Sequence, residues 1–170
     1  MKFSVNREAL LRPLTIVAGA VERRQTMPIL SNLLIIASGN KLVITGTDLE
    51  VELSATIILD DAAETNGDIT VPARKFVDIC KSLPDSCDIS FSVDQGKAVV
   101  KSGRSRYTLA TLAAADFPSV QKDESSFSAT VNQGDFAQLI DRTAFSMAQQ
   151  DVRYYLNGML WELSGNKLKA

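Results

Sequence analysis

The chain contains one long stretch of sequence twice. A shift of 126 positions places residues 3–44 over residues 129–170 without a gap. Both copies contain the pentapeptide Ser-Gly-Asn-Lys-Leu, at 38–42 and at 164–168, and their apolar positions agree, as in Leu10 with Phe136 and Leu14 with Ile140. The period is far longer than the ~20–50 residues of solenoid repeats. The sequence therefore predicts a duplicated domain rather than a repeat array.

The second copy is shorter than the first, so we expect one complete module and the opening of another. The expected division is 1–125 for the first module with its linker and 126–170 for the incomplete second module. Residues 113–126, which contain Pro118 and a polar run without periodicity, are the expected linker. On this basis we expect the chain to be an N-terminal fragment of a longer protein.

Hydrophobic periodicity within the first module predicts the order strand, helix and three strands, followed by the same order again. Asn6 is a suitable N-cap for the first helix, over about 7–20, and Pro72 suits the first position of the second, over 73–83. Expected strands are 2–5, 29–37, 41–47, 49–59, 68–71, 87–93, 97–102 and 106–112. Two amphipathic helices side by side on antiparallel sheets bury both apolar stripes, which is an α+β fold.

Composition argues against several classes of function. The chain has no histidine, which excludes histidine-based triads and histidine metal sites within these residues. Its glycines form no phosphate-binding loop. The spacing of Cys80 and Cys87 matches no zinc or redox motif, so we expect both to be buried thiols. No apolar run approaches the ~20 residues of a membrane span. We expect a cytoplasmic protein that is not an enzyme and needs no metal or cofactor.

Charge is unevenly distributed, although the net charge is only −2. Residues 43–73 contain seven acidic residues and no lysine or arginine, whereas residues 74–122 contain eight basic and five acidic residues. Such segregation predicts an acidic face and a basic face on one body. Ordinary solvated strands remain the alternative.

Several motifs in this chain resemble those of the bacterial beta sliding clamp family, the processivity subunits of the replicative DNA polymerase III. They are Met27-Pro28-Ile29-Leu30, Val71-Pro72-Ala73-Arg74-Lys75-Phe76, Ser102-Gly103-Arg104-Ser105-Arg106, Ala115-Asp116-Phe117-Pro118 and, most specifically, the segment from Gln150 to Met159. The resemblance covers all 170 residues. It implies the DNA-clamp fold, in which three modules form a crescent and two crescents close head to tail into a ring around duplex DNA, with helices lining the hole.

The resemblance also implies which residues contact DNA. Arg24 and, one period later, Gln150 belong to loops that touch double-stranded DNA, with Tyr154 and Tyr155 beside the second loop. We expect the two tyrosines to enter a strand and point to opposite faces, so that at least one is exposed and can stack on a base of a primer–template junction. A further set, Arg7, Arg12, Arg74, Lys81 and Arg142, would together give the hole a positive lining.

Two protein interfaces are implied by the same resemblance. The last strand of the first module and its second helix would form the head-to-tail homodimer joint, through Lys75, Ile79, Leu83, Arg104, Arg106, Tyr107 and Leu109. An unpaired edge strand is a natural template for strand addition. Leu156 matches a wall of the pocket that takes up short peptide motifs of the polymerase and the clamp loader, although core packing would also explain it.

Two other functions remain open. The first alternative is a non-enzymatic protein-interaction scaffold built from the duplicated module. The second is a hydrolase that uses Asp48, Glu50 and Glu52, but these acids lack a base, a nucleophile or a metal motif beside them, and a solvated acidic strand explains them.

Overall fold

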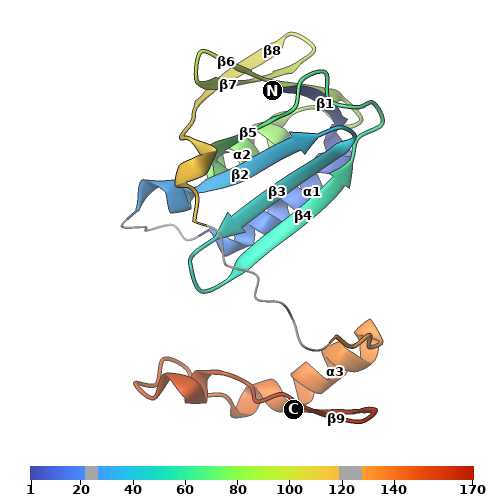
Figure 1. Ribbon diagram of the computed structural model, residues 1–170, viewed down its shortest axis with the longest axis vertical. Coiled ribbons are helices and arrows are strands. Elements are labelled where there is room, and N and C mark those ends of the chain that lie inside the picture. Colours follow the sequence, from blue (N-terminus) through green and yellow to red (C-terminus); the bar gives the residue numbers. More distant parts are fainter. Residues whose placement is uncertain (22–26, 119–127) are drawn as a thin grey trace. The chain divides into compact units, whose positions relative to one another are not determined.

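The computed structural model describes residues 1–21, 27–118 and 128–170, and the chain divides into two compact units. Unit 1 is Met1–Gln121 and unit 2 is Lys122–Ala170. Figure 1 labels the main helices and strands of each unit. None of the described helices is long and apolar enough to cross a membrane.

Unit 1 has the expected order of strand, helix and three strands, present twice. The first half contains β1 (Lys2–Asn6), α1 (Arg7–Val17), β2 (Asn32–Ser38), β3 (Lys41–Thr47) and β4 (Glu52–Ile58), with 3-10 turns η1 (Ala18–Ala20) and η2 (Pro28–Ser31). The second half contains β5 (Gly67–Pro72), α2 (Ala73–Ser82), β6 (Asp88–Asp94), β7 (Lys97–Ser102) and β8 (Ser105–Ala110), followed by the 3-10 turn η3 (Ala114–Asp116).

The two halves exchange their first strands. One sheet has the order β1-β6-β7-β8 and the other β4-β3-β2-β5, and every pairing is antiparallel. The strand before each helix therefore completes the sheet of the opposite half. This arrangement has the internal symmetry expected of two equivalent halves, and it confirms an α+β fold with antiparallel sheets.

A single large core joins both sheets to both helices. Helix α1 buries Leu10, Leu14 and Val17, which recur at helical spacing, and α2 buries Phe76 and Cys80 among others. The exchanged strand contributes Phe3, whose ring stacks on Phe91 of β6 at a centroid distance of 5.0 Å. The exchange of β1 is thus fixed by aromatic packing as well as by the strand ladder.

Local sequence explains where the helices begin. Asn6 has extended backbone angles, and its side-chain oxygen accepts a hydrogen bond from the amide of Glu8 at 3.0 Å, as expected for an N-cap. Pro72 ends β5 and is the residue before α2 rather than its first helical residue, because its ψ is still extended. It offers no side-chain acceptor.

Unit 2 repeats the start of unit 1 with the register expected from the duplication. Helix α3 (Gln133–Thr143), η4 (Ala144–Ser146) and η5 (Tyr154–Asn157) each lie 126 positions after α1, η1 and η2, residue for residue. Asn132 caps α3 as Asn6 caps α1. A short hairpin of β9 (Glu162–Ser164) and β10 (Lys167–Lys169) follows. The duplication seen in the sequence is therefore also present in the structure.

Candidate nucleic-acid interface

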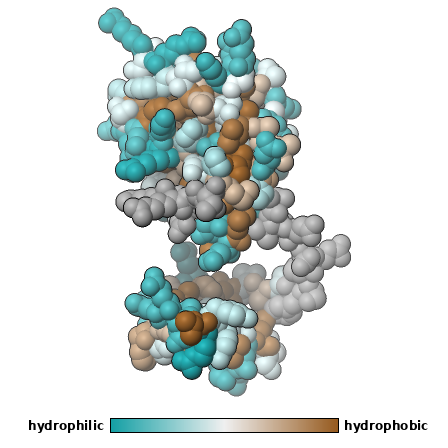
Figure 2. Space-filling model, turned by 90° about the vertical axis from the view of Figure 1, so that its left-hand side faces the viewer, coloured by the Kyte–Doolittle hydropathy of each residue, from teal (hydrophilic) through white to brown (hydrophobic). Residues whose placement is uncertain are grey.

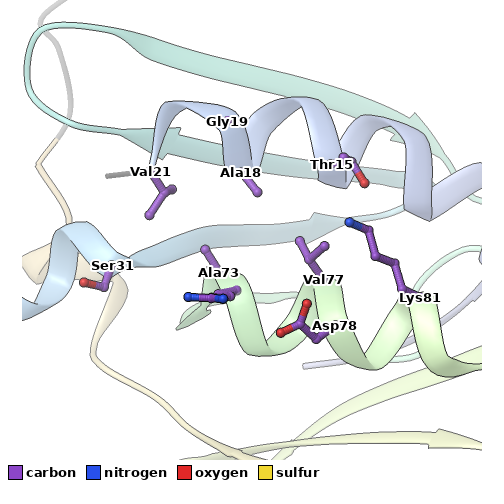
Figure 3. A pocket seen from close by; sticks show the side chains of 10 residues that line it. Thr15, Ala18, Gly19, Val21, Ser31, Ala73, Val77, Asp78 and Lys81 are labelled. Carbon is purple, nitrogen blue, oxygen red and sulfur yellow. The ribbon is translucent and has the colours of Figure 1, made fainter. Parts of the chain in front are cut away.

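The two helices of unit 1 lie side by side, and a groove of about 400 Å³ lies between them (Figure 3). Small residues make the groove possible, since Ala18 and Gly19 line it from η1, which follows α1, and Ala73 lines it from the start of α2. Lys81 and Asp78 on α2 carry its charges together with Arg74. A second hollow of about 470 Å³ adjoins it and shares Thr15 and Lys81.

Three of the basic residues expected on the helical face of unit 1, namely Arg12, Arg74 and Lys81, are exposed. They project from two helices onto the solvent side of the core. Glu8 and Asp78 line the same hollows, so the face is only moderately positive. Such a surface can contact phosphates without reading the sequence of bases. On the side of unit 1 that Figure 2 shows, apolar side chains gather in patches that hydrophilic side chains surround.

Arg7 does not belong to this lining. Its side chain is only 12% exposed; Nε donates to the carbonyl oxygen of Cys80 at 2.9 Å, and Nη1 pairs with Asp85 at 2.8 Å. The guanidinium thus satisfies a carbonyl at the end of α2 and ties it to the start of α1. Its neighbour Glu8 accepts a hydrogen bond from the amide of Ser86 at 2.7 Å, which lowers the pKa of Glu8. The expectation of a lining role for Arg7 is wrong, because this arginine is structural.

In unit 2 the segment 148–157 forms a loop organised by Asp151. The carboxylate of Asp151 accepts hydrogen bonds from the side chain and the backbone amide of Arg153, and these bonds hold its pKa below the usual range. Asn157 closes the loop, since its side chain accepts from the amide of Asp151 at 3.0 Å and donates to its carbonyl at 3.1 Å. Gln150 is exposed at the start of this loop with a left-handed φ of 58°.

Tyr154 and Tyr155 are both exposed, by 82% and 67% respectively. They begin the 3-10 turn η5 and do not enter a strand, so the expected opposite orientation is wrong. A 3-10 turn rotates successive side chains by about 120° rather than by the ~180° of a strand, and the two rings meet edge to face with centroids 6.1 Å apart. The expectation that at least one ring is exposed is confirmed. Exposed aromatic rings suit stacking on an unpaired base.

Strand β8 is an edge strand of its sheet within the described residues, pairing there only with β7. Arg104 and Arg106 are exposed, and the register places Arg106 directly opposite Lys101, which is also exposed. Like charges opposite each other destabilise a sheet. An acidic partner strand would remove this repulsion. Sequence reasoning missed Lys101, although the two-residue turn at Gly103 and Arg104 already implied its pairing with Arg106.

The other residues expected at the homodimer joint differ in exposure. Lys75 is exposed on α2, whereas Ile79 and Tyr107 are partly buried and pack against the main core. Leu83 and Leu109 are buried members of that core. These two leucines therefore pack inside unit 1 rather than on its surface.

The remaining expected residues have different positions. Arg24 lies outside the described residues. Arg142 is exposed near the end of α3, and Leu156 in η5 is 37% exposed. The acidic Asp48 is a turn residue, because its carboxylate accepts the amides of Glu50 and Val51, which lowers its pKa. Among residues 1–21, 27–118 and 128–170, no cluster of three or more potential metal ligands occurs.

Cys80 is buried and Cys87 is half-buried, and neither forms a disulfide. Burial raises the pKa of the Cys80 thiol to about 12. This agrees with the expectation of buried thiols for Cys80 and only in part for Cys87.

Comparison with protein families identifies both units. Residues 1–121 match the family model of the N-terminal domain of the DNA polymerase III beta subunit, and residues 130–170 match the model of its central domain. The chain belongs to the beta sliding clamp family. It is 57% identical over all 170 residues to the beta sliding clamp of Pseudomonas aeruginosa, 48% to that of Vibrio cholerae and 49% to that of Escherichia coli.

Solved beta clamp structures show the same fold. The crystal structure of the DNA polymerase III beta subunit from Pseudomonas aeruginosa matches 99% of this chain with a TM-score of 0.94 and 56% identity, over 45% of its own length. The beta subunit from Caulobacter crescentus matches 99% of this chain with a TM-score of 0.88 and 39% identity, again over 45% of its own length. The chain spans 46% of the length of the curated clamps that it matches.

Proposed function

We propose that this chain is part of a sliding clamp that encircles duplex DNA and tethers the replicative polymerase to it, without catalytic activity or a cofactor of its own. The observation that carries the proposal is the repeated module, in which helices occur as a pair on one surface and a basic edge strand ends the sheet. Modules joined edge to edge would form a ring lined by helices. A cytoplasmic location follows from this role in replication.

Closure of the ring would use β8 of unit 1 as a joint in a head-to-tail homodimer. Lys75, Arg104 and Arg106 would meet an acidic partner edge, while Ile79, Leu83, Tyr107 and Leu109 would give the joint its apolar support. Ring interfaces of this kind are heterologous, and closure covers the edges. Reversing the charge of both Arg104 and Arg106 in the full-length protein should weaken the dimer in sedimentation experiments. An unchanged dimer would count against the joint.

Contact with DNA would be electrostatic in the loop that contains Arg24 and aromatic in the loop that contains Tyr154 and Tyr155. Arg24→Ala in the full-length protein should lower binding about equally on any duplex and reduce the salt slope by up to about one unit, because one phosphate contact is lost. Changing Tyr154 and Tyr155 to alanine should preserve that slope and selectively weaken binding to primer–template junctions. Gln150 would add a hydrogen bond without charge. Equal loss on blunt duplexes and junctions would refute the aromatic role.

Partner proteins, namely the polymerase and the clamp loader, would dock short peptide motifs against Leu156. Its partial exposure in a 3-10 turn supports this role. Leu156→Ala in the full-length protein should weaken the binding of such peptides and leave DNA binding unchanged.

The second candidate function is a docking scaffold that does not encircle DNA. A decisive experiment compares retention on nicked circular DNA with retention after the same DNA is linearised. A clamp remains on the circle and is lost from the free ends of the linear form. Equal retention on both forms would favour the scaffold.

A further inference from the structure

Unit 1 contains a small apolar cluster that is separate from its main core. Ile29 and Leu30 of η2 pack with Phe117, and Leu34 of β2 packs against them. Leu30 is only 2% exposed, and Phe117 is 7% exposed. Figure 1 shows the segment containing η3 beside η2, although more than 80 residues separate these segments in sequence. We call the surface formed by Ile29, Leu30 and Leu34 the Leu30 site.

The segment that brings Phe117 to the Leu30 site is anchored by a buried polar contact. Thr70 donates from its backbone amide and its hydroxyl to the carbonyl oxygen of Leu112, at 3.2 and 3.0 Å. The same hydroxyl accepts from the amide of Leu112 and from the side chain of Asn32, at 3.2 and 2.8 Å. Both Thr70 and Asn32 are buried, so the anchor is costly to break.

Beyond this anchor, the chain turns and inserts one aromatic ring. In the 3-10 turn η3, the amide of Phe117 donates to the carbonyl oxygen of Ala114 at 3.0 Å. The last turn residue is Asp116, which is exposed. The segment is therefore a short turn with an acidic residue followed by an apolar aromatic anchor.

The duplication relates the Leu30 site to the surface around Leu156. One period places Leu30 on Leu156 and Leu34 on Leu160, and η2 and η5 have the same length and position within their units. Leu156 is the residue proposed to line the partner-peptide pocket. If one module of this architecture binds a peptide there, the equivalent surface in unit 1 has the same backbone framework and a leucine at the same place.

We propose that the Leu30 site is a second peptide-docking site of the clamp, occupied in cis by the chain's own segment around Phe117. The inference rests on the proposed role of Leu156. The ligand class is a short turn-forming peptide with an aromatic side chain, and the Leu112–Pro118 segment is its internal example. A tethered segment acts at an effective concentration in the mM range. A peptide at μM concentration is therefore excluded from unit 1 as long as Phe117 is present.

The test removes the internal occupant and supplies it in trans. The protein is the 170-residue chain with Leu156→Ala and Leu160→Ala, so that unit 2 lacks the leucines equivalent to Leu30 and Leu34. The Phe117→Ala substitution is introduced into this chain. The probe is a fluorescently labelled synthetic peptide with the sequence of residues 112–118, and anisotropy measures its binding. The matched control peptide has alanine in place of phenylalanine.

We expect the Phe117→Ala variant to bind the peptide saturably, at least about 10-fold more tightly than the chain that retains Phe117, because the tethered competitor is removed. The control peptide should not bind. Phe117→Leu should give an intermediate affinity, and it serves as the second variant if the alanine variant does not fold, as judged by circular dichroism. Adding Leu34→Ala to a folded variant should weaken binding, because Leu34 packs against the site.

Absence of binding by a folded Phe117 variant would overturn the proposal, as would equal binding of both peptides. This readout requires neither DNA nor a partner protein, so it is separate from the test of the ring. If the Phe117 variant binds but Leu156→Ala in the full-length protein does not affect partner peptides, the cis-occupied site stands and the assignment of Leu156 fails.

Discussion

Replacing Arg7 with leucine tests how unit 1 connects its two helices. The substitution keeps an apolar stem but removes every donor, which leaves the carbonyl of Cys80 without its 2.9 Å partner and Asp85 without its cation. A hydrogen bond from a charged group contributes about 1.5–3 kcal/mol. The Asp85 pair adds little, because the Asp85 side chain is 90% exposed and exposed pairs contribute at most about 1 kcal/mol. We therefore expect a loss of about 1.5–3 kcal/mol in the free energy of unfolding.

Urea denaturation followed by far-ultraviolet circular dichroism measures this loss. With a slope near 2 kcal/mol per molar urea, the midpoint should fall by roughly 1 M. Trp161, the single tryptophan, stacks on Phe136 in unit 2, so its fluorescence provides an internal control that should not change. Arg12→Leu is the matched variant, since Arg12 is exposed on the same helix. If Arg7→Leu lowers the midpoint no more than Arg12→Leu does, the connection has no energetic importance.

Three further substitutions or reactions test other contacts. The hydrogen bond from the Ser86 amide lowers the pKa of Glu8 below 4.5 in the folded protein. Ionised Glu8 therefore stabilises the fold above pH 4.5, and this stabilisation is lost as the pH falls through the folded pKa. Glu8→Gln should make the free energy of unfolding depend less on pH in the acid range. The Cys80 thiol, with its pKa raised to about 12 by burial, should resist a thiol reagent at pH 8 until denaturant is added, whereas rapid reaction of both thiols would contradict the burial. A Cβ on Gly46 would lie 2.9 Å from both the Val17 carbonyl oxygen and Leu33, so Gly46→Ala should cost about 1–3 kcal/mol in a melting experiment, and Gly19→Ala, which meets nothing within 4 Å, should not.

Periodicity and duplication predicted much of the fold because they report directly on burial. Strand 97–102 was predicted to the residue, and the Asn6 cap and the stripe of α1 follow from spacing alone. The strand expected from residue 29 begins at Asn32, because Pro28 starts a 3-10 turn instead. The exchange of β1 and β5 was not predictable from local patterns, since it depends on which distant sheet each strand joins.

The candidate site was harder to predict from the sequence. The sequence predicts that at least one of Tyr154 and Tyr155 is exposed, but the turn geometry of the pair depends on hydrogen bonds of Asp151 and Asn157 that no periodicity reveals. The role of Arg7 depends on a contact across 73 positions to Cys80. A basic residue on a helix therefore cannot be assigned to a surface from its helical position alone.

The exchanged strand β1 also determines the order in which the protein can be completed during synthesis. Phe3 pairs with Phe91, so apart from the single bridge between Lys2 and Thr65, β1 has no strand partner until nearly 90 more residues have been made. At about 5–20 residues per second, this delay is roughly 4–18 s. During that time the first half has its helix and its hairpins but not the sheet to which its own N-terminus belongs. Each half of unit 1 needs a strand from the other half to complete its sheet. Neither half can therefore reach its native structure alone during translation.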